Sequence, residues 1–269
     1  MNQPHARFDQ EQYESLTQRL EAARDAVRAK PAAPHLRVYL FQLLAIMGDW
    51  KRALAQLQVS AQLDPLAIPM AQTYREAVRC EAFRAEVFKG TRHPQILGEP
   101  PAWLALLLDA LRLLAAGSPD AAAQAREQAL ELAPATPGTI NGHAIEWIAD
   151  ADSRLGPVCE AIINGQYYWL PFAQIKEIKF GAPEDLRDLV WTGAEFTLVN
   201  GGTMVGLIPT RYPGSEAIER DEIRLARLTE WQDAGAECWV GSGQRTWATD
   251  VQDFALLDVR ELKLQTETP

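Results

Sequence analysis

Charged side chains that could bind a ligand or catalyse a reaction are concentrated in the second half of this 269-residue chain. Two aspartates stand close together in the segment WIADADSR, and an Arg-Tyr pair lies between two prolines in LIPTRYPG. A rigid proline-flanked loop can hold polar side chains in place. Opposite charges could draw these segments into one polar cluster, whose predicted members are Asp150, Asp152, Arg154, Arg187, Arg211, Tyr212 and Arg245. We expect a structural ion-pair network that fixes loops, with a ligand site of a small-ligand sensor or an enzyme as the alternative.

The same region contains residue types that bind metal ions, because His143 and Glu146 precede the two aspartates. On a β-strand, Asp150 and Asp152 would face one side of the sheet and His143 the other. Protein zinc sites draw on several His or Cys ligands, and no second histidine is near in the sequence. We therefore predict no metal and no cofactor here, and a solvated or hydrogen-bonded turn instead.

Three cysteines, Cys80, Cys159 and Cys238, are widely spaced and odd in number, so we predict no disulfide framework and a reducing cytoplasm. Cys238 lies near Gly241-Ser242-Gly243 and could be imagined as a nucleophile. No sequence signature of a cysteine enzyme surrounds it, and a free cysteine is usually a small buried hydrophobic residue. The glycine-rich segments lack the Lys-Ser/Thr pair of a phosphate-binding loop. The chain is predicted not to be an enzyme.

Composition excludes several classes of partner. The net charge of −10 argues against nucleic acid, because neutralising phosphates needs clustered Lys and Arg. The longest apolar run, around Leu104 to Leu108, is far shorter than the roughly 20 residues that span a bilayer. The polar start of the chain has no signal-peptide core. We expect a cytoplasmic protein that binds neither nucleic acid nor membranes.

Apolar residues recur at helical spacing from residue 8 to about residue 134 and define a predicted helical domain, 1–136. Its first helix is expected from about Asp9, a plausible N-cap, to Ala29. A repeat supports a tetratricopeptide-like array, whose units are about 34 residues long. The repeated positions, 69 residues apart, are Leu44, Gly48, Ala53, Leu63 and Pro65, and then Leu113, Gly117, Ala122, Leu132 and Pro134.

The pattern changes to short strands after Pro137-Gly138, which predicts an α+β domain, 137–269. Asn164-Gly165 and Asn200-Gly201-Gly202 each separate two apolar runs, as hairpin turns do. The fold class is therefore helical followed by α+β, with a mainly antiparallel, partly closed sheet.

An apolar stripe in the helical half is the best candidate for a partner-binding groove. Most of such a stripe must be core, but a short helical array leaves one face incompletely covered, where an amphipathic helix of a partner could lie. The candidate groove residues are Tyr39, Leu40, Leu43, Leu44, Trp50 and Leu54.

Long segments of the second half are similar to the ImpE (also SciE or TagJ) family of accessory proteins of bacterial type VI secretion systems. These segments are EWIADADSRLGPVCEAIINGQYYWLPF, DLRDLVW, LIPTRYPGSE, RLARLTEW, GQR and LLDVREL. The resemblance extends over essentially the whole chain, since the family also begins with a tetratricopeptide-like region. Cys159 departs from the family pattern, in which an aliphatic residue is usual.

The resemblance implies a non-enzymatic cytoplasmic adaptor of the contractile secretion machinery. Members of the family look like proteins that contact a short helix of the small sheath subunit, TssB, and assist sheath assembly or disassembly. The partner implied for this chain is thus a sheath subunit and, indirectly, the disassembly ATPase. The family supplies no catalytic residues to carry over.

Overall fold

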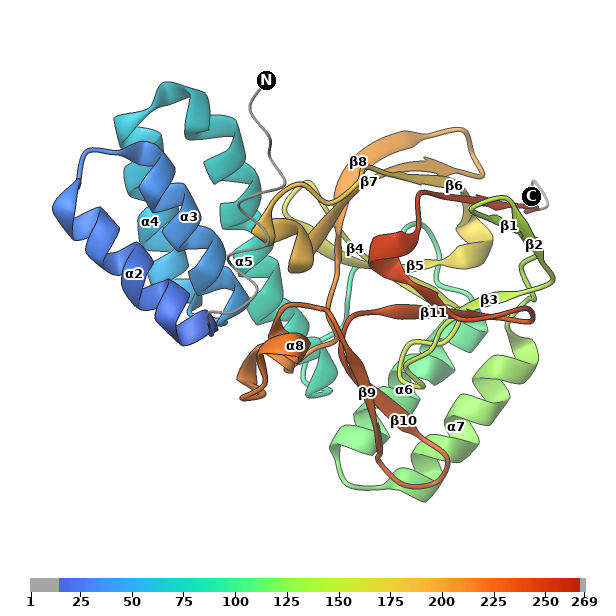
Figure 1. The fold of residues 1–269 in the computed structure, drawn as a ribbon. Coiled ribbons are helices and arrows are strands. Elements are labelled where there is room, and N and C mark those ends of the chain that lie inside the picture. The colour runs from blue at the N-terminus through green and yellow to red at the C-terminus, as the bar shows by residue number, and fades with distance from the viewer. Residues whose placement is uncertain (1–14, 267–269) are drawn as a thin grey trace. The chain divides into compact units, whose positions relative to one another are not determined.

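The computed structural model describes residues 15–266 of the chain (Figure 1). The chain divides into two compact units, the N-terminal unit, Met1–Arg75, and the C-terminal unit, Glu76–Pro269. Helix α5 (Ile68–Phe88) crosses the boundary between them. Along the described part of the chain, no helix is both long enough and apolar enough to cross a membrane.

Within residues 15–75, the N-terminal unit contains three helices, a 3-10 turn and the start of α5. The helices and the turn are α2 (Leu16–Ala29), α3 (Pro34–Ile46), α4 (Trp50–Leu63) and η1 (Pro65–Ala67). Ser15 forms a capping box with Gln18 at the start of α2, and Asp49 caps α4. The predicted cap Asp9 lies outside the described residues. Every residue of α3 from Leu40 to Ile46 is buried, which makes α3 the centre of this unit.

The repeat seen in the sequence is a repeated helix pair. In the C-terminal unit, α6 (Ala102–Ala115) and α7 (Pro119–Leu132) follow the pattern of α3 and α4, and α4 and α7 have the same length. Gly48 and Gly117 close the two turns with φ of 70° and 77°, where glycine is free of the strain that a side chain would cause. Ala53 and Ala122 are both buried where each pair packs. The tetratricopeptide classification stays a prediction.

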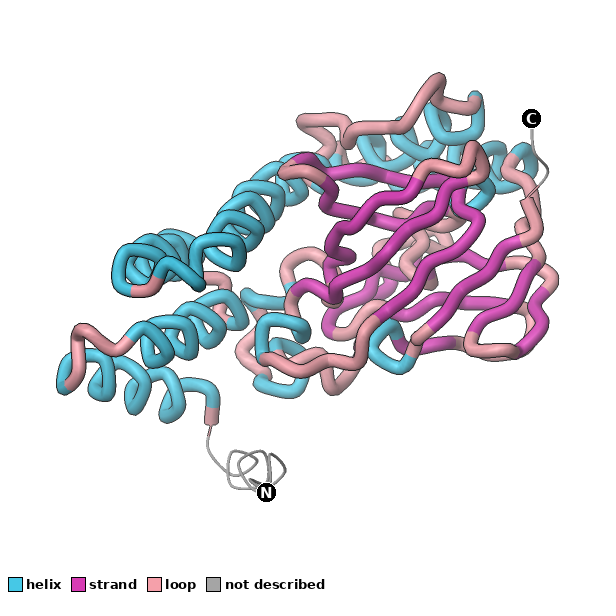
Figure 2. Tube along the Cα trace, turned by 90° about the horizontal axis from the view of Figure 1, so that it is seen from above, coloured by secondary structure: helices cyan, strands magenta, loops and turns pink. Residues whose placement is uncertain are grey.

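The C-terminal unit contains an antiparallel sheet of eight strands in the order β2-β1-β13-β6-β7-β8-β4-β5 (Figure 2). Two smaller sheets have the orders β10-β9 and β12-β11-β3. The strands are β1 (Gly138–Ile140), β2 (His143–Ile145), β3 (Ile148–Asp150), β4 (Val158–Ile163), β5 (Gln166–Pro171), β6 (Ile175–Phe180), β7 (Trp191–Leu198), β8 (Thr203–Pro209), β9 (Thr229–Asp233), β10 (Trp239–Gly243), β11 (Thr246–Thr249), β12 (Phe254–Ala255) and β13 (Glu261–Leu264). Short helical turns are η2 (Phe172–Gln174), η3 (Leu186–Leu189), η4 (Ser215–Ala217), α8 (Asp221–Arg224) and η5 (Leu256–Asp258).

The eight-stranded sheet is not closed, and the predicted partial closure is not confirmed. Its outer strands, β2 and β5, stand at opposite ends of the strand order. The edge of β5 is covered locally by the segment before α6: the Gln95 N–H donates to the Tyr167 carbonyl over 2.9 Å, and the Trp169 N–H donates to the Gln95 carbonyl over 3.0 Å. A covering segment satisfies edge groups without closing a barrel.

The two predicted hairpin turns are confirmed. Asn164 and Gly165 have positive φ values of 50° and 72° and join β4 to β5, as a two-residue hairpin turn requires. Gly201, with φ of 80°, lies in the turn between β7 and β8. The core of the unit contains Trp247, whose ring meets Phe172 edge-on at a centroid distance of 5.4 Å.

The change from helices to strands falls where the sequence pattern places it, because α7 ends at Leu132 and β1 begins at Gly138. The compact units divide the chain elsewhere, between Arg75 and Glu76, since α6 and α7 belong to the same unit as the sheets. The division into domains 1–136 and 137–269 stays a prediction.

Candidate functional site

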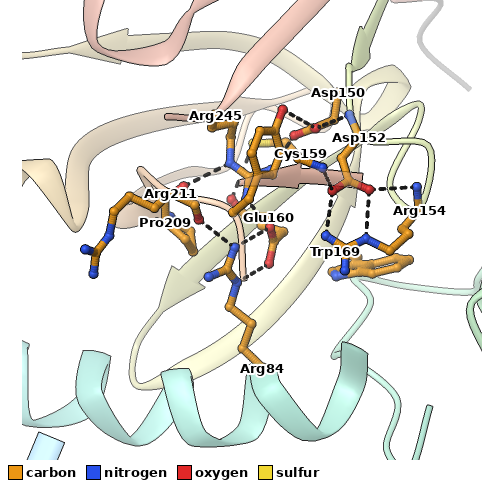
Figure 3. Close-up of polar contacts among 12 residues, drawn as sticks. Arg84, Asp150, Asp152, Arg154, Cys159, Glu160, Trp169, Pro209, Arg211 and Arg245 are labelled. Carbon is orange, nitrogen blue, oxygen red and sulfur yellow. Dashed lines mark hydrogen bonds and ion pairs between the residues drawn. The ribbon is translucent and has the colours of Figure 1, made fainter. Parts of the chain in front are cut away.

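A buried network of opposite charges lies inside the C-terminal unit (Figure 3). Its members come from six segments: the second half of α5, β3, the loop after β3, β4, the loop after β8, and the residue before β11. The network residues are Glu81, Arg84, Asp150, Asp152, Arg154, Glu160, Arg211 and Arg245, four basic and four acidic side chains. Equal numbers of each sign allow these charges to be buried together.

Glu160 is the centre of the network. Its carboxylate accepts from Arg84 Nε over 2.6 Å and from Arg84 Nη2 over 2.9 Å, a two-bond geometry typical of strong Arg–carboxylate pairs. Arg245 pairs with Glu160 through one nitrogen and with Asp150 through another, and donates from Nε to the Pro209 carbonyl over 2.9 Å. The side chains of Glu160, Arg245 and Asp150 have no solvent exposure.

A second pair extends the network toward the surface. Arg154 donates to both oxygens of Asp152, over 2.8 and 2.6 Å, and its guanidinium lies 4.7 Å from the centre of the Phe88 ring. The Asp152 carboxylate also accepts from the backbone N–H of Gly241 in β10, over 3.0 Å. Asp152 therefore fixes the β9–β10 hairpin to the loop after β3.

Aromatic hydroxyl groups complete the hydrogen bonding of the carboxylates. The Tyr167 hydroxyl donates to Glu160 and accepts from Trp169 Nε1 over 2.8 Å. The Tyr212 hydroxyl lies 3.1 Å from Asp150 Oδ1 and accepts from the Thr246 N–H over 3.0 Å. Burying charge is favourable only when the remaining lone pairs are satisfied in this way.

The neighbouring guanidinium groups determine the protonation of the central carboxylate. Burial raises the pKa of Glu160, but the combined effect of Arg84 and Arg245 is larger and lowers that pKa to about 2. Burial, together with the neighbouring charge of Asp152, raises the pKa of Asp150 to about 6, although Arg245 acts in the opposite direction. Glu160 therefore remains ionised well below neutral pH.

The structure brings most of the predicted polar cluster together. Asp150, Asp152, Arg154, Tyr212 and Arg245 contact one another directly or through a shared partner. Arg211 contributes its backbone carbonyl, which accepts from Arg84 over 2.9 Å, while its side chain donates to the Arg224 carbonyl. Arg187 instead pairs with Asp185 beside η3.

Sequence reasoning missed Glu81, Arg84, Glu160 and Tyr167. One signal was available, because Glu160 is the single charge in VCEAII, a strand whose six residues are all buried. A lone carboxylate in such a strand must find a buried cation. Nothing in the sequence shows that this cation is Arg84, which lies 76 residues earlier in α5.

The network has the properties of a structural element. The guanidinium groups and hydroxyl groups already occupy its carboxylate oxygens, and its centre has no exposed atoms.

All three cysteines are buried, and burial raises the pKa of Cys80 to about 12 and also raises the pKa of Cys159 and Cys238. The nucleophilic thiolate is therefore scarce near neutral pH. Within residues 15–266, no group of three or more His, Cys, Asp and Glu side chains could hold a metal ion.

The six candidate groove residues separate into core and surface. Leu40, Leu43 and Leu44 are buried, because α3 is packed on several sides, whereas Tyr39, Trp50 and Leu54 are half-buried. A cleft of about 360 Å³ in the N-terminal unit reaches the edges of Leu40 and Leu44. Its rim is basic, and its lining residues are Arg24, Arg28, Leu40, Leu44, Arg52, Ala55 and Gln56.

Known proteins share both the sequence and the fold. The model of the family described as "ImpE protein" matches residues 142–263. The type VI secretion system accessory component TagJ of Pseudomonas aeruginosa is 50% identical over 252 residues, which cover 93% of this chain and 88% of that protein. The crystal structure of protein VPA1032 from Vibrio parahaemolyticus is similar with a TM-score of 0.84 and 26% identity, over 94% of each chain. This chain therefore belongs to the ImpE (TagJ) family.

Proposed function

We propose that the chain is a non-catalytic adaptor of a type VI secretion system that binds a helix of the small, TssB-like sheath subunit. In this role it assists sheath assembly or disassembly in the cytoplasm, alongside the disassembly ATPase. The observation that carries the proposal is the 50% identity to the accessory component TagJ along nearly the full length of both proteins.

The geometry of the N-terminal unit supports a helix-binding role. Its cleft has an apolar floor formed by Leu40 and Leu44, and a rim that carries Arg24, Arg28 and Arg52. An amphipathic helix binds such a site by placing its apolar side chains on the floor. Acidic side chains of that helix would then face the arginine rim. These opposite charges would orient the helix in the cleft and raise its association rate.

The contacts of the ion-pair network do not favour a catalytic role, because its carboxylates are already paired with arginines. A substrate would have to displace Arg84 or Arg245 from Glu160, and leaving that carboxylate buried without its partners costs several kcal/mol. A thermal-shift screen with nucleotides, metal ions and small anions tests this point. A true ligand at a hundredfold its dissociation constant would add about 2.7 kcal/mol to the free energy of unfolding, and the adaptor proposal predicts no such increase.

Calorimetric titration with the small sheath subunit from the same organism tests the proposed function. We expect binding with a dissociation constant below tens of micromolar, which corresponds to at least about 6 kcal/mol. Arg24→Glu combined with Arg52→Glu should weaken binding by at least tenfold. Arg79→Glu combined with Arg112→Glu makes the same change of charge at exposed positions outside the cleft and should leave the affinity within twofold. Absence of binding at tens of micromolar, with both proteins folded, contradicts the proposal.

A further inference from the structure

A second, larger groove lies in the C-terminal unit, lined by residues of α7, of β3 and of the turn of the β9–β10 hairpin. Figure 1 labels these elements. We name it the α7–β3 groove. Its volume is about 1070 Å³, and its lining residues are Ala123, Arg126, Glu127, Leu130, Glu131, Trp147, Ala149, Asp150, Ala151, Ser153, Gly156, Ala236, Glu237 and Ala248. This volume is at the upper end of the roughly 300–1,000 Å³ of small-molecule pockets, so the groove can also accommodate a segment of a macromolecule.

The groove exposes apolar surface. Leu130 and Trp147 have exposed fractions of 48% and 38%, large values for apolar side chains of this size. One face of α7 supplies a continuous wall, because its groove residues follow the spacing i, i+3, i+4, i+7 and i+8 from Ala123 to Glu131. This wall is about 12 Å long at 1.5 Å per residue, enough for two turns of a docked helix.

The repeated helix pair explains how the groove arises. At the repeat positions where α4 carries Leu54 and Leu57, α7 carries Ala123 and Arg126. Leu57 is buried in its helix pair, whereas Arg126 turns to donate from Nη2 to the Ala236 carbonyl over 2.8 Å. The loss of two large apolar side chains opens space along α7 that the wall of β3 does not fill.

The charge of the groove selects the chemistry of its occupant. Glu127, Glu131 and Glu237 are exposed on its rim, and among the described residues no ion pair neutralises them. Arg126 is the one basic residue of the lining, and Asp150 is already paired with Arg245. The C-terminal unit as a whole has 17 basic and 29 acidic side chains, a net charge of −12. A basic partner segment would meet complementary charge at these three glutamates.

The backbone of β3 favours a helix over an added strand. One edge of β3 pairs with β11, and the Ala151 N–H extends this pairing to the Thr246 carbonyl. On the other edge, the Asp150 N–H donates to the Gly156 carbonyl over 2.7 Å. This bond engages the end of the three-residue strand on its unpaired edge, whereas strand addition needs a free row of edge groups. We infer that the α7–β3 groove is a second docking site, which takes a basic amphipathic helix of a partner protein.

A fluorescence anisotropy titration of the full chain tests this inference. The probe is a fluorescein-labelled synthetic peptide of about 18 residues, with leucines at i, i+3, i+4 and i+7 spacing and lysines elsewhere, a length that can fold on docking. Two control probes replace every lysine by glutamate or every leucine by glutamine. We expect the Lys-Leu probe to bind at least tenfold more tightly than either control, and binding of a control probe with equal affinity overturns the inference.

Variants then locate the binding. Glu127→Lys combined with Glu131→Lys, and separately Ala123→Trp, which fills the groove without changing charge, should each weaken binding at least tenfold. Glu195→Lys combined with Glu219→Lys makes the matched change of charge at exposed positions outside the groove and should stay within twofold. Unchanged thermal melting shows that each variant is folded. If the groove variants bind like the unmodified chain, or if the matched variant weakens binding equally, the groove is not the site.

Discussion

The two compact units fill their interiors in different ways. In the N-terminal unit, α3 contributes a run from Leu40 to Ile46 that is buried and almost wholly apolar. In the C-terminal unit, an apolar core beside Trp247 adjoins a network that buries Glu160 and Arg245 completely. The first interior gains stability from area removed from water, and the second must hold its charges in fixed geometry to avoid a large desolvation cost.

The two interiors should therefore respond differently to substitution. An apolar interior accepts many changes of shape at moderate cost. A buried charge network fails when one member is removed, because the remaining charges lose their compensation. The network joins α5 to β3, β4 and the loop after β8, so it fixes the frame that carries the wall of the α7–β3 groove.

The largest effect is expected at the centre of the network. Glu160→Gln keeps the shape of the side chain but leaves Arg84 and Arg245 without their shared carboxylate, and we expect the free energy of unfolding to fall by about 3–5 kcal/mol. Urea denaturation followed by circular dichroism measures this loss. Glu195→Gln, at an exposed position of strand β7 in the same sheet, is the matched control and should stay within about 0.5 kcal/mol. A loss for Glu160→Gln as small as the control would show that the network contributes nothing.

An apolar truncation in the N-terminal unit is the counterpart. Leu43→Ala removes a fully buried side chain and should cost about 2–5 kcal/mol through lost burial and a cavity. Leu63→Ala, with an exposed fraction of 39%, is the control and should cost clearly less. Leu43→Met conserves volume and should cost under about 1.5 kcal/mol. If every substitution of Glu160 lowers the free energy of unfolding by more than this, the contrast between the two interiors is sharper.

Acid should weaken the charge network of the C-terminal unit, because its central carboxylate becomes protonated. Glu160 has a pKa lowered from 4.5 to about 2, so its stabilisation is fully present above pH 4.5 and is lost as the pH falls toward 2. The full loss corresponds to about 3 kcal/mol. Asp150 acts oppositely: its pKa of about 6 means that proton uptake favours the folded chain between about pH 6 and pH 4. The difference in unfolding free energy between the unmodified chain and Glu160→Gln should therefore shrink between pH 4.5 and pH 2; a constant difference would contradict the assigned protonation.

The smallest effect is expected at the N-cap of α4, whose capping contact involves no residue of the charge network. Asp49→Ala removes the side chain that caps α4 and should cost about 1 kcal/mol. Asp49→Asn retains an acceptor at the cap and should recover most of that loss. Thermal unfolding of both variants checks this pair, and equal losses would mean that the cap is not the stabilising contact.

Features that depend on neighbours in sequence were predictable. The turns at Gly48, Gly117 and Asn164-Gly165 need positive φ, so glycine and asparagine mark them directly. Asp150 and Arg245 are 95 residues apart in the sequence. Their membership of one cluster of opposite charges was predictable, but their direct pairing was not. The pairing of Arg84 with Glu160 was not, because it depends on how α5 packs against β4.

Two expectations were not confirmed, for physical reasons that the sequence does not show. Partial closure of the sheet was expected, but the Gln95 segment covers the edge of β5 and removes the need for closure. An apolar stripe does not distinguish a groove from a core, so Leu43 was expected to line a groove although it is fully buried. Leu40 and Leu44 reach the cleft only at its floor.

The adaptor account is tested most directly by hydrogen–deuterium exchange of the chain with and without the small sheath subunit, read by mass spectrometry. Binding at the cleft of the N-terminal unit predicts slower exchange in α2 and α4, around Arg24 and Arg52, and unchanged exchange in β4 and β11, where the network is already buried. Exchange that is unaltered in α2 and α4 at saturating sheath subunit would contradict the account.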